Sequence, residues 1–296
     1  MAYAILLSLW VNRFLSRQFA EPLLALREAA ETVARRDFTA RVDIQSADEF
    51  GELGGVFNRM VQGLWEREAM TRFVSTDVLE VVGRKVDPGQ EVSRTRVSVL
   101  FSDIRGFTTL SERISPEELV SVLNDYFTAM EACLTAHRGV IDKLVGDALM
   151  AVFRDQPGTD HHAVRAGRAA LAMREALLAF NRDRQERGLF PIHNGIGINT
   201  GEVVAGRVGS RTGRLDYTVI GDTVNIAARL EKESVRAGSR IVISAATLVA
   251  LGGRGRVRFL DRVLLKGKDQ PFPLYELTRL AEPEQSPEST GPERPA

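Results

Sequence analysis

Residues 99–108 read Val-Leu-Phe-Ser-Asp-Ile-Arg-Gly-Phe-Thr, an apolar run that ends at an aspartate, Asp103. Residues 143–147, Lys-Leu-Val-Gly-Asp, carry a second aspartate, Asp147, beside a glycine. A single aspartate at the end of a strand is usually a turn former. In a β-α-β-β unit, however, the first strand can lie beside the later hairpin, which brings both carboxylates to one edge of the sheet. The pair therefore predicts a site for two metal ions.

The surrounding residues, 94–280, alternate between strand and helix patterns. The clearest helix has Ser115 as N-cap, Pro116 in its first turn and Glu118 as capping-box partner. The order begins β-α-β-β-α-β, which predicts an α+β, ferredoxin-like βαββαβ sheet with helices packed on one face. Apolar runs and turn signals predict strands at 97–102, 140–144, 148–153, 192–199, 202–208, 215–220, 240–244, 257–265 and 273–278, and helices at 116–136, 160–187 and 222–232.

The bulk composition excludes several classes of protein. The 296 residues contain 39 Lys plus Arg and 39 Asp plus Glu, so no overall basic charge favours nucleic-acid binding. The single cysteine, Cys133, cannot form an intramolecular disulfide, which fits a reducing cytosol. It lies in an apolar helical pattern and is interpreted as a buried small side chain.

The N-terminal residues are almost wholly apolar from Ala2 to Val11 and are followed by Asn12 and Arg13. A helix of this length spans about half of the roughly 30 Å hydrocarbon core of a membrane. No positive charge precedes the run, so a signal peptide is not expected. We interpret residues 1–12 as part of a transmembrane helix, with the rest of the chain on the cytoplasmic side of the inner or plasma membrane. An interfacial or oligomer-buried apolar helix is the alternative.

Residues 13–66 contain two amphipathic helices with an extended connector. Pro22 opens the first helix and Asp48 caps the second. Each helix has one apolar stripe, and a parallel dimer that forms a four-helix bundle would bury both stripes. The stripes consist of Leu23, Leu26, Ala30 and Val33 in the first helix and of Leu53, Phe57, Met60 and Leu64 in the second.

This segment resembles a HAMP domain. The resemblance rests on Pro22-Leu23, on Asp48-Glu-Phe-Gly-Glu-Leu53 and on Phe57-Asn-Arg-Met60. It implies a homodimeric relay just inside a membrane; an ordinary dimeric coiled coil is the alternative. Residues 67–93 are predicted to form a linker helix, and residues 281–296, rich in Pro, Glu and Ser, are predicted to be disordered.

The two aspartates suit hard divalent cations. Two adjacent carboxylates repel each other, and a pair of Mg²⁺ ions removes the repulsion. Their ligands are oxygens, with no His or Cys nearby. The four histidines (His137, His161, His162 and His193) have no zinc spacing and are interpreted as surface or local structure. Gly106, shortly after Asp103, lets the backbone turn so that N–H groups can face a polyphosphate.

A third motif lies at residues 216–231, Asp-Tyr-Thr-Val-Ile-Gly-Asp-Thr-Val-Asn-Ile-Ala-Ala-Arg-Leu-Glu. Gly221 and Asp222 begin a helix on which Asn225 and Arg229, four residues apart, share one face. An amide and a guanidinium on one face can hold a ribose and neutralise charge on a phosphoryl group. A solvated helix face is the alternative.

Together, residues 101–108, 143–147 and 221–229 resemble the class III nucleotidyl cyclases. The resemblance covers residues 94–278 and implies conversion of a nucleoside triphosphate to its 3′,5′-cyclic monophosphate and pyrophosphate. It implies that Asp103, Asp147 and the Ile104 carbonyl hold two Mg²⁺ or Mn²⁺ ions. The other implied roles are phosphate binding by the N–H groups of Gly106, Phe107 and Thr108 and by Lys266 (or the nearby Lys268), ribose orientation by Asn225, and transition-state stabilisation by Arg229.

The resemblance also implies a substrate and a partner. Lys143 can donate to an adenine ring nitrogen and Thr218 can accept from the exocyclic amine, so ATP is the expected substrate. Threonine at position 218, where many members have aspartate, is typical of a subgroup of which some members respond to bicarbonate. Each active site of the family is shared between two catalytic domains, so a homodimer is expected. A guanylate cyclase and a catalytically silent signalling module are the alternatives.

Overall fold

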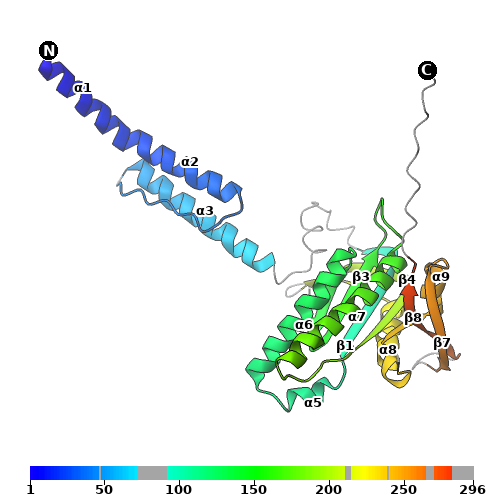
Figure 1. The fold of residues 1–296 in the computed structure, drawn as a ribbon. Coiled ribbons are helices and arrows are strands. Elements are labelled where there is room, and N and C mark those ends of the chain that lie inside the picture. Colours follow the sequence, from blue (N-terminus) through cyan, green and yellow to red (C-terminus); the bar gives the residue numbers. More distant parts are fainter. Residues whose placement is uncertain (47, 72–91, 211–214, 239, 265–269, 282–296) are drawn as a thin grey trace, which may run out of the picture. The chain divides into compact units, whose positions relative to one another are not determined.

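The computed structural model describes residues 1–46, 48–71, 92–210, 215–238, 240–264 and 270–281 (Figure 1). The chain divides into two compact units, Met1–Val74 and Ser75–Ala296.

The first unit contains two helical segments. Helix α1 (Ala2–Leu15) continues through a short π-helix (Ser16–Ala20) into α2 (Glu21–Ala34), and α3 spans Glu49–Thr71 (Figure 1). The predicted cap of the second helix is confirmed, because the Asp48 carboxylate accepts hydrogen bonds from the N–H groups of Phe50 and Gly51 at 3.0 and 3.3 Å. Among the described residues, no helix is both long enough and apolar enough to cross a membrane.

Side-chain hydrogen bonds hold the connector between these helices to α3, and the Arg41 guanidinium donates to the Gln62 side-chain oxygen at 3.0 Å. The Asn58 amide accepts from the Val42 N–H at 2.9 Å and donates to the Val42 carbonyl at 2.8 Å. Val42 and Val61 are buried. Much of the apolar surface of both helices nevertheless stays exposed in a single copy, as the predicted dimer requires; the exposed side chains include Leu23, Leu24, Leu53, Val56, Met60 and Trp65.

The second unit is built on one eight-stranded sheet. Its path runs β2-β3-β1-β4-β6-β8-β7, and β5 pairs with β4 beside that path. The predicted β-α-β-β-α-β opening is confirmed, since the first four strands have the ferredoxin-like order. The elements are β1 (Val92–Ile104), α5 (Phe107–Ser111), α6 (Pro116–Ala136), β2 (Val140–Val145), β3 (Ala148–Arg154), α7 (His162–Glu186), β4 (Asn194–Gly209), β5 (Leu215–Ile220), α8 (Asp222–Arg236), β6 (Ile241–Ser244), α9 (Ala245–Ala250), β7 (Gly255–Val263) and β8 (Phe272–Leu280).

Helices cover both faces of this sheet, whereas the sequence predicted helices on one face. Alternate residues of β1 point to opposite faces. Leu100 and Ile104 share a core with Tyr126 of α6 and Met173 of α7. On the other face, β1 packs with Ala227 of α8, through Val97 and Val99. The third layer was not predicted because the β-α-β-β-α-β pattern ends before α8 begins.

Strand β4 also differs from the prediction. Two strands, 192–199 and 202–208, were expected, with residues 200–201 between them, but Asn194–Gly209 is one continuous strand. The glycines of β4 allow helix α8 to pack closely against this strand. A Cβ at Gly197 would lie 2.2 Å from the Glu231 nitrogen, and one at Gly201 would lie 2.5 Å from the Thr223 hydroxyl oxygen. Helix α8 therefore rests directly on the backbone of β4.

Three predictions concern residues outside the described part of the chain. Helix α3 reaches Thr71, but most of the predicted linker helix, 72–91, lies outside it. Lys266 and Lys268 lie outside it as well, and so do residues 282–296 of the predicted disordered tail.

Candidate active site

The register of the sheet brings the two aspartates together. Asp103 is the penultimate residue of β1, and Asp147 lies in the tight turn between β2 and β3, where Gly146 has a φ of +62°. Strands β1 and β3 are antiparallel, with Ser102 opposite Leu149. The end of β1 therefore meets the β2–β3 turn, and the predicted juxtaposition of Asp103 and Asp147 is observed.

The electrostatics of this pair fit a divalent cation. Oδ1 of Asp103 is buried and has no hydrogen-bond partner among the described residues. Burial and then the neighbouring Asp147 carboxylate raise the pKa of Asp103 to about 6, while the Ile104 N–H and Lys232 act in the opposite direction. An orphaned carboxylate oxygen beside a second carboxylate is the oxygen-rich environment that Mg²⁺ or Mn²⁺ prefers.

The loop after β1 turns as its glycine predicts. Gly106 has a φ of +70°, in the left-handed region that favours glycine, and it caps the short helix α5. The Leu110 N–H donates to the Gly106 carbonyl at 3.0 Å. The N–H groups of Phe107 and Thr108 belong to the first turn, where no preceding helical carbonyl is available to accept from them.

The predicted base-reading residues, Lys143 and Thr218, meet through a third residue that the sequence analysis missed. The Thr218 hydroxyl donates to Oδ2 of Asp142 at 2.8 Å, and Nζ of Lys143 lies 3.2 Å from the same oxygen. Thr218 is 6% exposed, whereas the Lys143 side chain is 40% exposed. An acidic residue next to Lys143 was visible in the sequence, but only the fold brings Thr218 to it.

Helix α8 carries the predicted ribose and phosphate residues on one face. Asn225 is exposed and Arg229 is partly exposed. Within the described residues of one chain, no hydrogen bond or ion pair joins either of them to Asp103 or Asp147. The helical twist of about 100° per residue puts Glu231 on the other side of α8 from Arg229.

Glu231 is a second residue that the sequence analysis missed. It is buried against β4, where a Cβ at Gly195 would lie 2.7 Å from its Oε1. Burial and then Asp103 raise the pKa of Glu231 to about 7, while Lys232 and Arg105 lower it. Glycines spaced along a strand, as in Asn194-Gly-Ile-Gly, signal such close packing of a helix.

Comparison with known proteins identifies the chain. Residues 90–278 match the family model of the adenylate and guanylate cyclase catalytic domain, and residues 14–66 match that of the HAMP domain. The chain belongs to the adenylate and guanylate cyclase family. It is 36% identical over 283 residues to an adenylate cyclase of Anabaena cylindrica, an alignment that covers 89% of this chain and 55% of that protein.

Solved cyclase structures agree with this assignment. The adenylyl cyclase CyaB from P. aeruginosa is 35% identical with a TM-score of 0.59, covering 64% of this chain and 96% of that one. The guanylyl cyclase Cya2 is 36% identical with a TM-score of 0.58, covering 66% and 98%. The chain spans about half the length of the curated relatives it matches, 55% and 40% for two of them.

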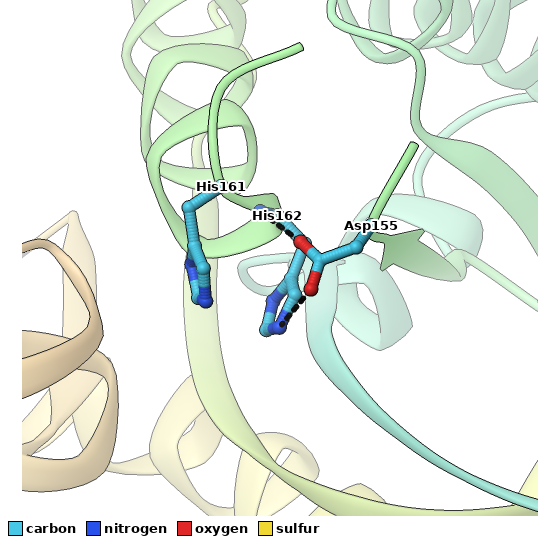
Figure 2. Close-up of side chains that lie close together, drawn as sticks. All are labelled: Asp155, His161 and His162. Atoms are coloured by element: carbon cyan, nitrogen blue, oxygen red, sulfur yellow. Dashed lines mark hydrogen bonds and ion pairs between the residues drawn. The ribbon is translucent and has the colours of Figure 1, made fainter. Parts of the chain in front are cut away.

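A separate cluster of potential metal ligands lies at the start of α7. One ligand atom each from Asp155, His161 and His162 lies within 4.8 Å of the others (Figure 2). Two of these groups already accept hydrogen bonds from backbone N–H groups in the first turn of α7. The Asp155 carboxylate accepts from the His162 N–H at 3.2 Å, and Nδ1 of His161 accepts from the Ala163 N–H at 3.2 Å. The cluster is distinct from the aspartate pair.

His162 predicts a pH dependence of stability. Its side chain is fully buried, with Nδ1 2.9 Å from the Ser98 hydroxyl, and burial followed by His161 lowers its pKa to about 4. The unfolded chain therefore binds more protons between about pH 4 and 6.5, so stability falls as the pH drops through that window, by on the order of 2–3 kcal/mol.

Two measurements test this expectation. In ¹³C-labelled protein, the imidazole resonance that is lost in His162→Asn should remain that of a neutral ring at pH 5. A resonance that titrates near the ordinary value of about 6.5 would contradict it. Carboxylates whose pKa values are raised in the folded state increase its stability as the pH falls, which opposes the effect of His162. Thermal unfolding of the wild type is therefore compared with that of His162→Asn. The variant should lose less stability than the wild type between pH 6.5 and 4.5.

Proposed function

We propose that this chain is an adenylate cyclase that converts ATP to 3′,5′-cyclic AMP and pyrophosphate. The juxtaposition of Asp103 and Asp147 at one sheet edge is the observation that carries the proposal. In the reaction, the ribose 3′-oxygen forms a bond to the α-phosphorus, and the bond from that phosphorus to the β-phosphate oxygen breaks. The 3′-hydroxyl proton is released and pyrophosphate leaves.

The metal-binding residues in this proposal are Asp103, Asp147 and the carbonyl of Ile104. Two Mg²⁺ or Mn²⁺ ions bound there would lower the pKa of the 3′-hydroxyl and offset the charge of the phosphates. The raised pKa of Asp103 supports the proposal, since burial and the facing carboxylate leave uncompensated negative charge at this point.

The remaining chemistry comes from positioning and charge. Asn225 orients the ribose, and the Arg229 guanidinium stabilises the negative charge that grows on the α-phosphate in the transition state. The backbone N–H groups of Gly106, Phe107 and Thr108 bind the β- and γ-phosphates. Lys266, with Lys268 as the alternative, reaches the terminal phosphates in this proposal.

We further propose that each site is shared by two chains. Asp103 and Asp147 meet within one chain, but Asn225 and Arg229 lie on the side of α8 away from the Glu231 face, which is the one near Asp103. One chain thus presents two half-sites that a symmetric dimer can combine twice. The exposed apolar side chains of α2 and α3 support a dimer as well.

The N-terminal unit is proposed as the regulatory relay. In this division, residues 13–66 form the HAMP domain, residues 67–93 the linker and residues 94–280 the catalytic domain. We propose that the apolar residues 1–12 attach the protein to a membrane and keep the catalytic domain in the cytoplasm. Removal of residues 1–12 tests the anchor, because equal partitioning of both forms between membrane and buffer would overturn it.

The proposed activity is tested directly with purified protein. We expect cyclic AMP from ATP in the presence of Mn²⁺ and little cyclic GMP from GTP. A preference for GTP would favour the guanylate cyclase alternative, and no product from either would favour a silent signalling module. Addition of bicarbonate at fixed pH tests whether the protein responds to bicarbonate, as some members with threonine at position 218 do. Unchanged activity would contradict such a response.

Lys143→Glu tests the choice of base. A carboxylate cannot donate to the adenine ring nitrogen but can accept from the N1–H and 2-amino groups of guanine. We expect kcat/KM for ATP to fall by about ten- to a hundredfold and the preference to move toward GTP. Lys143→Gln is the matched control, because it removes the charge without adding an acidic acceptor and should lower ATP turnover without favouring GTP.

A further inference from the structure

Strand β2 contains an irregularity at the residue that precedes Lys143. Ile141 pairs with Ala151 and Lys143 pairs with Met150, so the register shifts between them and Asp142 is the extra residue of a β-bulge. In a regular strand, neighbouring side chains point to opposite faces. The bulge re-aims Asp142 so that its carboxylate and the Lys143 ammonium come within 3.2 Å of each other.

The same carboxylate oxygen joins two strands of the sheet that do not pair with each other, β2 and β5. Strand β5, which carries Thr218, is separated from β2 by β4, β1 and β3 in the order of pairing. The Thr218 hydroxyl nevertheless donates to Oδ2 of Asp142 at 2.8 Å. The Asp142 side chain is 4% exposed, and burial raises its pKa while Thr218 and Lys143 lower it.

This hydrogen bond has a consequence for recognition of the base. A threonine hydroxyl has one hydrogen and two lone pairs. When its hydrogen is committed to Asp142, the hydroxyl can only accept a hydrogen bond from a nucleotide. Adenine presents a 6-amino donor at the position where guanine presents the O6 acceptor. A freely rotating hydroxyl could serve either base, whereas the Asp142-bound hydroxyl serves adenine alone.

We propose that Asp142 is a positioning residue that sets the base selectivity of the site by fixing the Thr218 hydroxyl as an acceptor and by holding the Lys143 ammonium in place. This inference rests on the proposed nucleotide site and deepens it. Asp142 acts through its two neighbours and does not itself contact the nucleotide. A purely structural role, in which Asp142 only ties β5 to β2, would change stability and leave the ratio of ATP to GTP use unchanged.

The test compares Asp142→Leu with Asp142→Asn. Leucine has a similar shape without an acceptor, and an apolar replacement of a buried ionic group is often tolerated. We expect the ratio of kcat/KM for ATP to that for GTP to fall by roughly three- to tenfold. Asparagine keeps one acceptor oxygen for Thr218 and Lys143, so its ratio should stay close to that of the wild type.

Thr218→Val supplies the second control. In the Thr218→Val protein, Asp142 has no hydroxyl at position 218 to orient. Adding Asp142→Leu to it should therefore change the ratio of kcat/KM for ATP to that for GTP less than Asp142→Leu does in the wild type. An unchanged ratio in Asp142→Leu, with equal losses for both nucleotides, would overturn the proposal. An equal fall of the ratio in Asp142→Asn would also overturn it.

Failure of the proposed activity is distinguishable from failure of this inference. If the wild type makes no cyclic nucleotide, equilibrium titration with ATP and GTP in Mg²⁺ reports the same selectivity without turnover. Asp142→Leu should then narrow the difference between the two dissociation constants, and an unchanged difference would overturn the inference. If Asp142→Leu does not fold, as judged by circular dichroism, Asp142→Ala is measured in its place with the same expected results.

Discussion

Mixing Asp103→Asn chains with Arg229→Ala chains should restore cyclase activity that neither variant has alone. Each single substitution is expected to lower kcat by on the order of 10²–10³-fold or more, because each removes charge stabilisation that is needed in the transition state. In a mixed dimer, one site combines the intact aspartates of one chain with the intact Arg229 of the other. Random exchange of subunits should therefore recover about a quarter of the wild-type activity.

The matched control for this experiment is a mixture of Asp103→Asn with Asp147→Asn chains. Both substitutions affect the same half-site, so every site in the mixed dimer lacks one carboxylate and activity should stay at the level of the single variants. Failure of the first mixture to exceed its separate components, with subunit exchange demonstrated by mass spectrometry, would contradict shared sites.

Asp103→Asn should also stabilise the metal-free protein while it abolishes catalysis. The Asp103 carboxylate has a buried, unpartnered oxygen and faces Asp147, and its pKa is raised to about 6. A neutral amide removes this unfavourable charge. Solvent screening reduces the effect because the group is only partly buried, so we expect about 1–2 kcal/mol at pH 7.5, or roughly 2–8 °C in Tm.

The sign of this effect depends on pH. The folded pKa of about 6 lies above the unfolded value of 3.8, so the folded wild type binds more protons between these values and loses stability as the pH rises through them. The advantage of Asp103→Asn should therefore be full above about pH 6 and absent below about pH 4. Calorimetry in EDTA at several pH values measures it.

Added metal should reverse the order of stability. Mg²⁺ or Mn²⁺ is expected to raise the Tm of the wild type and to leave that of Asp103→Asn nearly unchanged, because a ligand that binds only the folded state stabilises it. Asp125→Asn, at an exposed position of α6, is the control and should behave as the wild type does. If the Tm of metal-free Asp103→Asn were below that of the metal-free wild type, repulsion between Asp103 and Asp147 would be contradicted.

The sequence predicted those helices and strands well whose signals lie within a few neighbouring residues. The capping box of α6 is an example, since Ser115 accepts from the Glu118 N–H and the Glu118 side chain accepts from the Ser115 N–H, both at 3.2 Å. The strand-end positions of Asp103 and Asp147 follow from apolar runs and a glycine turn. These features depend on residues a few positions apart in the chain, so they can be predicted from the sequence without knowledge of the fold.

The failures concern features whose causes lie far apart in the chain. The break expected at residues 200–201 was wrong, because β4 is continuous there and Gly201 makes room for Thr223 of α8. The placement of α8 on the second face of the sheet could not be predicted, since it depends on the glycines of β4 and on the long extent of that strand.

The sequence by itself determined the family, the order of strands and helices, and the residue types of the site, because these reside in contiguous motifs. Only the tertiary structure decided that Asp142 joins Lys143 to Thr218 and that Arg229 lies on the opposite side of α8 from the buried Glu231. The first depends on a β-bulge and on the approach of β5 to β2, two strands that do not pair with each other. The second depends on which side of α8 rests on β4, which sets the direction of every other side chain on that helix.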